Sequence, residues 1–112
     1  IAEAMLLERP VITTNWSGNT DFCKSEHTFL VDYELEILEE DYGPYKKGQA
    51  WANPSVEHAS VLMGKVVADR SLAQRSAQRA STYVKDNLSP QTVGALMRLY
   101  LTEVYQDQIF GK

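Results

Sequence analysis

The chain has 112 residues, 44% of them hydrophobic, which is enough for one small domain with a modest core. Its formal charge of −4 at pH 7 offers no long-range attraction to phosphate backbones, and its basic residues are scattered along the chain. Composition alone therefore favours one domain and disfavours binding of nucleic acid.

The first half of the chain is predicted to alternate helix and strand. A helical pattern at 1–8 is followed by a β-branched run that predicts a strand at 11–15. A second strand is expected at 28–33 and a third at 35–38. They are followed by a loop that Gly43-Pro44 indicates. A helix, a buried strand, a glycine turn and another strand are typical of α/β layers. We therefore expect an α/β fold with two or three parallel strands.

The second half of the chain is predicted to form three helices. Each start is expected at a capping residue or at a proline that fits the first helical position: Asn53-Pro54, Ser71 and Ser89-Pro90. The first two helices are expected to end near Ala68 and Asn87. On this basis the chain divides into an α/β part at 1–52 and a helical part at 53–112.

The predicted helices carry apolar stripes at helical spacing. The stripe of the first is Val56, Ala59, Val61, Leu62, Met63, Val66 and Val67. The second helix has a narrower stripe opposite a solvated face: Leu72, Ala73, Ala77, Ala80, Tyr83 and Val84. The third is long and strongly amphipathic: Val93, Leu96, Met97, Tyr100, Leu101, Val104 and Tyr105.

Several residues of the first half have both a structural and a functional interpretation. The acidic run at 34–41 alternates with apolar residues, which predicts one wet face of an edge strand rather than a metal site. Trp16 and Trp51 are expected to be packing anchors, with sugar-binding platforms as the alternative. Lys46-Lys47 is expected in a solvated loop, with contact to an acceptor or a partner as the alternative.

The few cysteine and histidine residues limit the redox and metal sites that the chain can form. Cys23 is the lone cysteine, and neither His27 nor His58 stands at a metal-ligand spacing from it. We expect His27 in a loop, His58 at the surface, and no metal site.

No apolar run approaches the roughly 18 residues that span a bilayer. We therefore expect a cytoplasmic protein, whose longer parent could lie at the inner face of a membrane.

Two stretches of the sequence carry a resemblance to a known family. The first has the pattern E-A-M-x-x-x-x-P-V-I-x-T-x-x-x-G-x-x-D/E, formed by Glu3-Ala4-Met5, Pro10-Val11-Ile12, Thr14, Gly18 and Asp21. This pattern resembles the donor-binding domain of GT-B glycosyltransferases of family 4, the "group 1" glycosyltransferases. A second stretch resembles one subgroup of these enzymes: Tyr42-Gly43-Pro44-Tyr45, Gly48, Trp51-Ala52, Pro54, Val56-Glu57-His58-Ala59 and Leu62-Met63.

The resemblance implies the C-terminal half of a Rossmann-like GT-B domain, truncated at its N-terminus. The parent would be a retaining glycosyltransferase that uses a nucleotide-sugar donor and a sugar, lipid or polysaccharide acceptor, the acceptor being bound by the missing N-terminal domain. In the family the Glu that matches Glu3 holds the ribose of the nucleotide, so Glu3 is expected to bind and not to catalyse. Its alternative role is to favour the first turn of a helix. The family's diphosphate and catalytic residues precede Ile1, so we expect no catalytic residue, no cofactor and no activity in this chain alone.

A second candidate region and two rival functions complete the expectations. Gly18, Asn19, Thr20 and Asp21 follow a predicted strand end, which suits the rim of a site in an open α/β sheet. The alternative is a turn whose Asn or Thr caps a short helix. The rival functions are a non-catalytic module that presents its helices to a partner, and a GT-B-fold sugar-nucleotide epimerase. An open strand edge and an apolar last helix also predict self-association of the chain.

Overall fold

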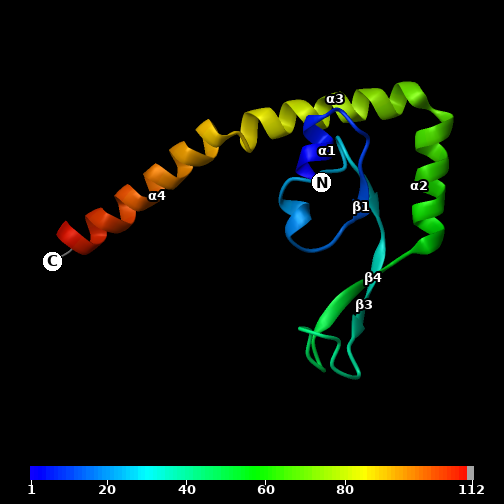
Figure 1. Cartoon of the computed structure of the whole chain (residues 1–112), viewed down its shortest axis with the longest axis horizontal. Coiled ribbons are helices and arrows are strands. Elements are labelled where there is room, and N and C mark those ends of the chain that lie inside the picture. The colour runs from blue at the N-terminus through cyan, green and yellow to red at the C-terminus, as the bar shows by residue number, and fades with distance from the viewer. Residues whose placement is uncertain (111–112) are drawn as a thin grey trace.

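The computed structural model describes the backbone of residues 1–110 and the side chains of residues 1–105. The chain is a mixture of helices and small sheets, as the expected α/β class requires (Figure 1). Its elements in chain order are α1 (Ala2–Leu6), β1 (Ile12–Thr14), the 3₁₀ helix η1 (Ser17–Asp21), β2 (Phe29–Val31), β3 (Tyr33–Ile37), β4 (Ala50–Pro54), α2 (Val56–Ala68), α3 (Arg70–Asn87) and α4 (Pro90–Phe110).

The parallel pair β1–β2 is the centre of the fold. Its register places Ile12 beside Phe29, Thr13 beside Leu30 and Thr14 beside Val31, and this confirms the expectation of parallel strands. Successive side chains of a strand point to opposite faces, so each face of the pair meets a different helix layer.

One face of the pair packs against α1 and α3. Its buried cluster comprises Met5, Val11, Cys23, Ala80 and Val84, with Ala4, Phe22 and Leu30 packed around it. The alanine stripe of α3 lets α1 approach closely, and Ser81 Oγ donates a hydrogen bond of 3.1 Å to the carbonyl of Leu6. The apolar stripe predicted for α3 is therefore the face that packs into the core.

The other face of the pair packs against α2. Its buried cluster is smaller and comprises Phe29, Val31 and Leu62, with Ile12, Ala59, Val66 and Leu72 packed around it. The rest of the predicted stripe of α2 lies outside the core, because one short strand pair offers too little surface to cover it. Its exposed residues are Val56, Val61, Met63 and Val67.

The expected third parallel strand is wrong. β3 pairs with β4 in an antiparallel hairpin whose register runs from Tyr33 beside Pro54 to Ile37 beside Ala50. β3 follows β2 after the single residue Asp32, so it extends past the end of the parallel pair, and the returning chain becomes its partner (Figure 1). Both faces of β3 are open to solvent, because Leu35 and Ile37 are exposed on one face and Glu34 and Glu36 on the other.

Two of the three predicted helix starts are displaced. Asn53 and Pro54 belong to β4, and α2 begins only at Val56, where Ser55 Oγ accepts the backbone N–H of His58 at 3.1 Å. α3 is capped by Asp69 instead of Ser71, through a bond of 2.8 Å to the backbone N–H of Leu72. Strand pairing in the first case, and an earlier capping residue of equal propensity in the second, displace the predicted starts. The ends at Ala68 and Asn87 are confirmed.

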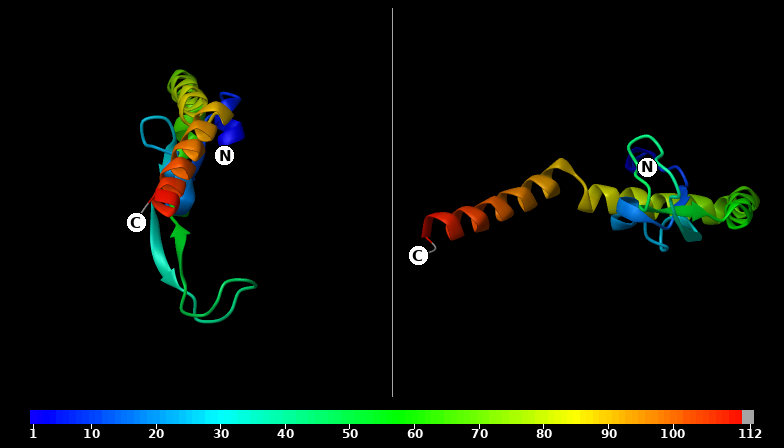
Figure 2. Two further views of the ribbon diagram at one scale, coloured as in Figure 1. Left: turned by 90° about the vertical axis from the view of Figure 1, so that its left-hand side faces the viewer. Right: turned by 90° about the horizontal axis from the view of Figure 1, so that it is seen from below.

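The last helix begins as predicted but lies away from the core. Ser89 Oγ accepts the backbone N–H of Thr92 at 3.2 Å, and α4 then extends away from the other elements in Figure 1 and in the right-hand view of Figure 2. The chain has a radius of gyration of 18.8 Å, against about 13 Å for a compact domain of this length. The apolar residues of α4 are therefore exposed: Val93, Leu96, Met97, Leu99, Tyr100, Leu101, Val104 and Tyr105.

The helices also bear on membrane association. Within residues 1–110, no helix combines the length and the apolar character needed to cross a bilayer.

Truncating Met5 tests this assignment of the core. Met5 belongs to α1 and is fully buried against α3. We expect Met5→Ala to lower the free energy of unfolding by about 2 to 5 kcal/mol, because it leaves a cavity as well as removing apolar contact. Leu7→Ala is the matched control, since Leu7 is 69% exposed, and it should change stability by less than about 0.5 kcal/mol. Urea unfolding followed by circular dichroism measures both. Equal losses for the two variants would contradict this core.

Candidate functional site

Glu3 lies in the first turn of α1 and points into solvent. Its side chain is 93% exposed, and its Oε2 lies 3.8 Å from the backbone nitrogen of Ile1. α1 has only five residues and no side-chain cap, so its dipole adds little to the site. The carboxylate is therefore open to hydrogen-bond donors of a ligand, such as hydroxyl groups.

The predicted rim, Gly18 to Asp21, forms most of η1, which is separated from the carboxyl end of β1 only by Asn15 and Trp16. Asn19 Nδ2 donates to the carbonyl of Thr14 at 2.8 Å and to Thr13 Oγ1 at 3.2 Å, which ties the turn to the strand. Thr20 Oγ1 donates to the carbonyl of Ser17 at 2.7 Å. Neither side chain caps η1, because the capping position is Trp16. Gly18 and Asp21 are exposed.

The two predicted site regions stay separate in their bonding. Among the described residues, no hydrogen bond or ion pair joins Glu3 to residues 17–21.

The turn that carries the predicted rim has an unusual backbone conformation, because Ser17 adopts a φ of 69°. A residue with a Cβ in this left-handed region stores about 1 to 3 kcal/mol of strain, and such strain clusters at functional positions.

A groove of about 780 Å³ opens between this turn and the β3–β4 hairpin. We call it the aromatic groove. Its lining includes two alanines of β4 together with Trp16, Ser17, Leu38, Tyr45, Gln49 and Trp51. It lies at the carboxyl end of β1, which is where ligands bind in open parallel sheets.

Aromatic pairs hold both walls of the aromatic groove. Trp16 packs on Tyr33, with ring centroids 5.1 Å apart, and so joins the residues that follow β1 and β2. Trp51 packs between Tyr42 and Tyr45 at 5.8 Å and 6.4 Å. Both tryptophans are half-buried. They are thus packing anchors, as expected, and each still contributes to the lining of the groove.

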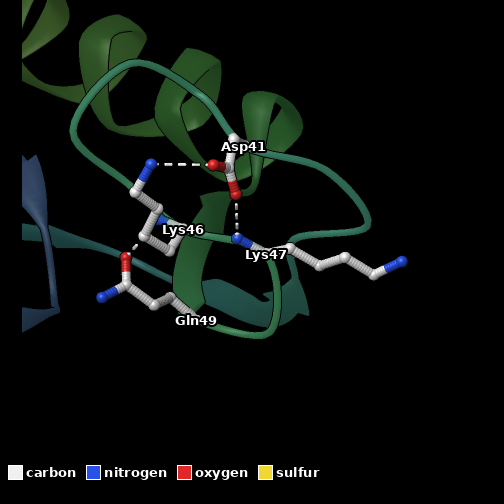
Figure 3. Close-up of polar contacts among 4 residues, drawn as sticks. All are labelled: Asp41, Lys46, Lys47 and Gln49. Atoms are coloured by element: carbon white, nitrogen blue, oxygen red, sulfur yellow. Dashed lines mark hydrogen bonds and ion pairs between the residues drawn. The ribbon is translucent and has the colours of Figure 1, made fainter.

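The loop that carries Tyr45 is closed by one carboxylate (Figure 3). Asp41 Oδ2 accepts from Lys46 Nζ at 2.8 Å, and Asp41 Oδ1 accepts from the backbone N–H of Lys47 at 2.9 Å. The backbone N–H of Lys46 in turn donates to Gln49 Oε1 at 2.7 Å. We call this set of bonds the Asp41 clasp. Lys46 and Lys47 are exposed, as the expected solvated loop requires, but Lys46 also closes the loop.

The two histidines have partners that the sequence did not reveal. His58 is half-buried, and its Nδ1 accepts the backbone N–H of Asp32 at 3.1 Å while lying 2.9 Å from Asp32 Oδ2. This contact joins the start of α2 to the end of β2. His27 lies in a loop, as expected, but is 94% buried against Tyr83, with ring centroids 4.7 Å apart. No local pattern marks either contact, because each joins segments far apart in sequence.

Burial also decides the protonation of His27. Desolvation lowers the pKa of its imidazole, against an opposing effect of Glu26, so the buried site favours the neutral ring. Neither ring nitrogen has a hydrogen-bond partner among the described residues. In residues 1–105, no group of three or more His, Cys, Asp or Glu side chains is placed to hold a metal ion.

In comparisons with known proteins, the chain has no significant match to a family model, a curated protein or a solved structure. The chemistry of the candidate site therefore rests on its own geometry.

The Asp41 clasp makes the loop around Tyr45 sensitive to one substitution. We expect Asp41→Ala to speed hydrogen exchange at the Lys47 amide, because it removes the acceptor of that N–H. Glu40→Ala is the matched control, since Glu40 is the exposed acidic neighbour. Exchange followed by nuclear magnetic resonance measures both variants. Unchanged protection of Lys47 in Asp41→Ala would contradict the clasp.

The same clasp should open in acid. The hydrogen bond from Lys46, and then that from the Lys47 backbone, lower the pKa of Asp41 below its usual value. A lowered pKa means that the folded loop favours the carboxylate, so the clasp is present at neutral pH and is lost as pH falls through the lowered pKa. The Lys47 amide shift should therefore titrate below the pKa of an ordinary aspartate. A midpoint above that value would show that no clasp stabilises the anion.

Proposed function

We propose that the chain is the C-terminal half of the nucleotide-sugar-binding domain of a retaining GT-B glycosyltransferase of family 4. The parent would be a cytoplasmic enzyme that transfers a sugar from a nucleotide-sugar donor to a sugar, lipid or polysaccharide acceptor. The observation that carries the proposal is the order of α1, parallel β1, η1 and parallel β2, with Glu3 exposed on the helix before the first strand. Helices on both faces of a parallel pair are the layering that a Rossmann-like domain needs.

Glu3 would hold the ribose of the donor. A carboxylate offers two oxygens, and these can accept hydrogen bonds from the two vicinal hydroxyls of a ribose ring. The exposed fraction of 93% leaves both oxygens accessible. Glu3 would bind rather than catalyse. Residues outside this chain would stabilise the departing diphosphate electrostatically.

The uncovered apolar surface supports the idea of a half-domain. α2 and α4 expose large aliphatic and aromatic side chains that a water-facing surface does not require. On α4, the most exposed residues of the predicted apolar stripe are Leu96, Met97, Tyr100, Leu101, Val104 and Tyr105. On this proposal, further parts of the parent cover these faces and extend the two-stranded parallel sheet.

The role of Glu3 is tested in the full-length parent by Glu3→Ala. We expect the affinity for the nucleoside diphosphate to fall by about 1.5 to 3 kcal/mol, because hydrogen bonds from hydroxyls to a charged acceptor are lost. Glu57→Ala is the matched control, since Glu57 is also exposed in a first helical turn. Calorimetric titration measures both variants. An unchanged affinity for Glu3→Ala would leave Glu3 as a helix-start residue only.

The chain alone should transfer no sugar. Positioning of both substrates and stabilisation of the leaving group supply most of the catalysis of such a transfer, and the proposal places those residues outside the chain. The assay mixes the purified chain with several nucleotide sugars and generic acceptors. Turnover above background that follows the protein through purification would contradict the half-domain. Conversion of a sugar nucleotide without any acceptor would favour the epimerase.

A second candidate function is a non-catalytic interaction module. The exposed apolar residues of α4 favour it, since a patch of this kind marks an interface between proteins. The two functions differ in their response to nucleotide. An interaction module is favoured if the full-length parent binds no nucleoside diphosphate, whereas the transferase requires that it does.

A further inference from the structure

We propose that the aromatic groove binds a neutral saccharide ring between the turn at Trp16 and the β3–β4 hairpin. The inference goes beyond the proposed function, because the family resemblance assigns no ligand to this groove. It favours the alternative role of the two tryptophans, as sugar-binding platforms, in addition to their packing.

Aromatic faces supply the main contact for such a ligand. Trp16, Tyr45 and Trp51 all line the groove. The face of an aromatic ring carries partial negative charge, and the apolar face of a pyranose presents C–H groups with partial positive charge. Tyr45 is 55% exposed although its ring packs beside Trp51, so part of its surface is open to a ligand.

The charge of the lining matches a neutral ligand. None of the residues that line the groove carries a charged side chain, so a phosphate or a carboxylate would find no cation there. Hydrogen-bonding groups are nonetheless present. Ser17 offers a hydroxyl group. The oxygen of the Gln49 side chain is identified by the N–H that it accepts from Lys46, and its NH₂ group makes no hydrogen bond within the described part of the chain.

The groove is largely formed before any ligand arrives. The Asp41 clasp fixes the loop that carries Tyr45 (Figure 3). Two backbone hydrogen bonds of 2.8 Å and 3.0 Å also join Tyr42 to Tyr45. On the opposite wall, Trp16 is held by its packing on Tyr33. Ordering these side chains in advance reduces the entropy that binding must overcome. The volume of about 780 Å³ also lies within the range of small-ligand sites.

The place of the groove suggests which sugar it would take. Glu3 lies on α1 and is not among the residues that line the groove, so a ribose at Glu3 and a saccharide in the groove would contact different residues. If the proposed function holds, the ring in the groove is a distal sugar of an acceptor whose reacting end binds to the missing N-terminal domain. That last step rests on the proposed function, whereas binding of a saccharide does not.

The test uses the 112-residue chain and two neutral probes, maltotriose and cellotriose. Sorbitol serves as a polyol without a ring, and UDP as a nucleotide. Nuclear magnetic resonance follows the indole N–H signals of Trp16 and Trp51. We expect at least one trisaccharide to shift both signals in a saturable manner, and sorbitol and UDP to leave them in place. No shift with either trisaccharide, or an equal or larger shift with sorbitol or UDP, would overturn the proposal.

Two matched variants locate the contact. Tyr45→Ala should weaken trisaccharide binding at least about tenfold, which corresponds to about 1.4 kcal/mol. Tyr105→Ala is the control, because Tyr105 is 58% exposed, lies on α4 and does not line the groove, and it should change affinity less than about twofold. Equal effects of the two variants would overturn the proposal. So would sedimentation that shows a dimer which Tyr45→Ala dissociates, since a second copy would then be the occupant.

The two proposals can fail independently. Loss of the saccharide site appears in the tryptophan signals of the wild-type chain and needs no variant to fold. Failure of the proposed function appears as a full-length parent that binds no nucleoside diphosphate. Neither measurement depends on the outcome of the other.

Discussion

The structure depends on the parallel pairing of β1 with β2 and on its burial from both sides. Each strand has three residues, and so few backbone hydrogen bonds do not hold a two-stranded sheet in water. The pair persists because Val11 and Leu30 pack toward α1 and α3, whereas Ile12, Phe29 and Val31 pack toward α2. Removing either helix layer would expose β-branched side chains to water, at about 25 cal/mol for each Å² of apolar surface.

The candidate sites follow from the same pair. The carboxyl ends of parallel strands meet at one edge of a sheet, so the residues after β1 and those after β2 become neighbours. Trp16 and Tyr33 are that neighbouring pair. β3 continues the line of β2 past the edge, and its return through β4 brings Trp51 to the opposite wall of the aromatic groove. The Asp41 clasp then sets the loop between the two strands.

The surface that the chain leaves uncovered is as informative as its core. α3 buries a stripe of small residues and exposes a polar face, as a helix on a water-facing surface does. α4 has the reverse character, because its apolar residues face solvent and it projects away from the sheet (Figure 2). A chain with this shape gains little free energy from its last helix. A larger parent or a partner would supply the missing contacts, and both proposed functions draw on this property.

The sequence by itself determined the features that depend on neighbouring residues. The parallel strands, the helix ends at Ala68 and Asn87, the start of α4 and the alanine stripe of α3 all follow from caps, β-branched runs and helical spacing. Only the tertiary structure decided β4, the burial of His27 and the meeting of Trp16 with the hairpin. These features join segments that lie far apart in the chain. Their free energy comes from pairing and burial against a distant partner, and no local pattern records which partner that is.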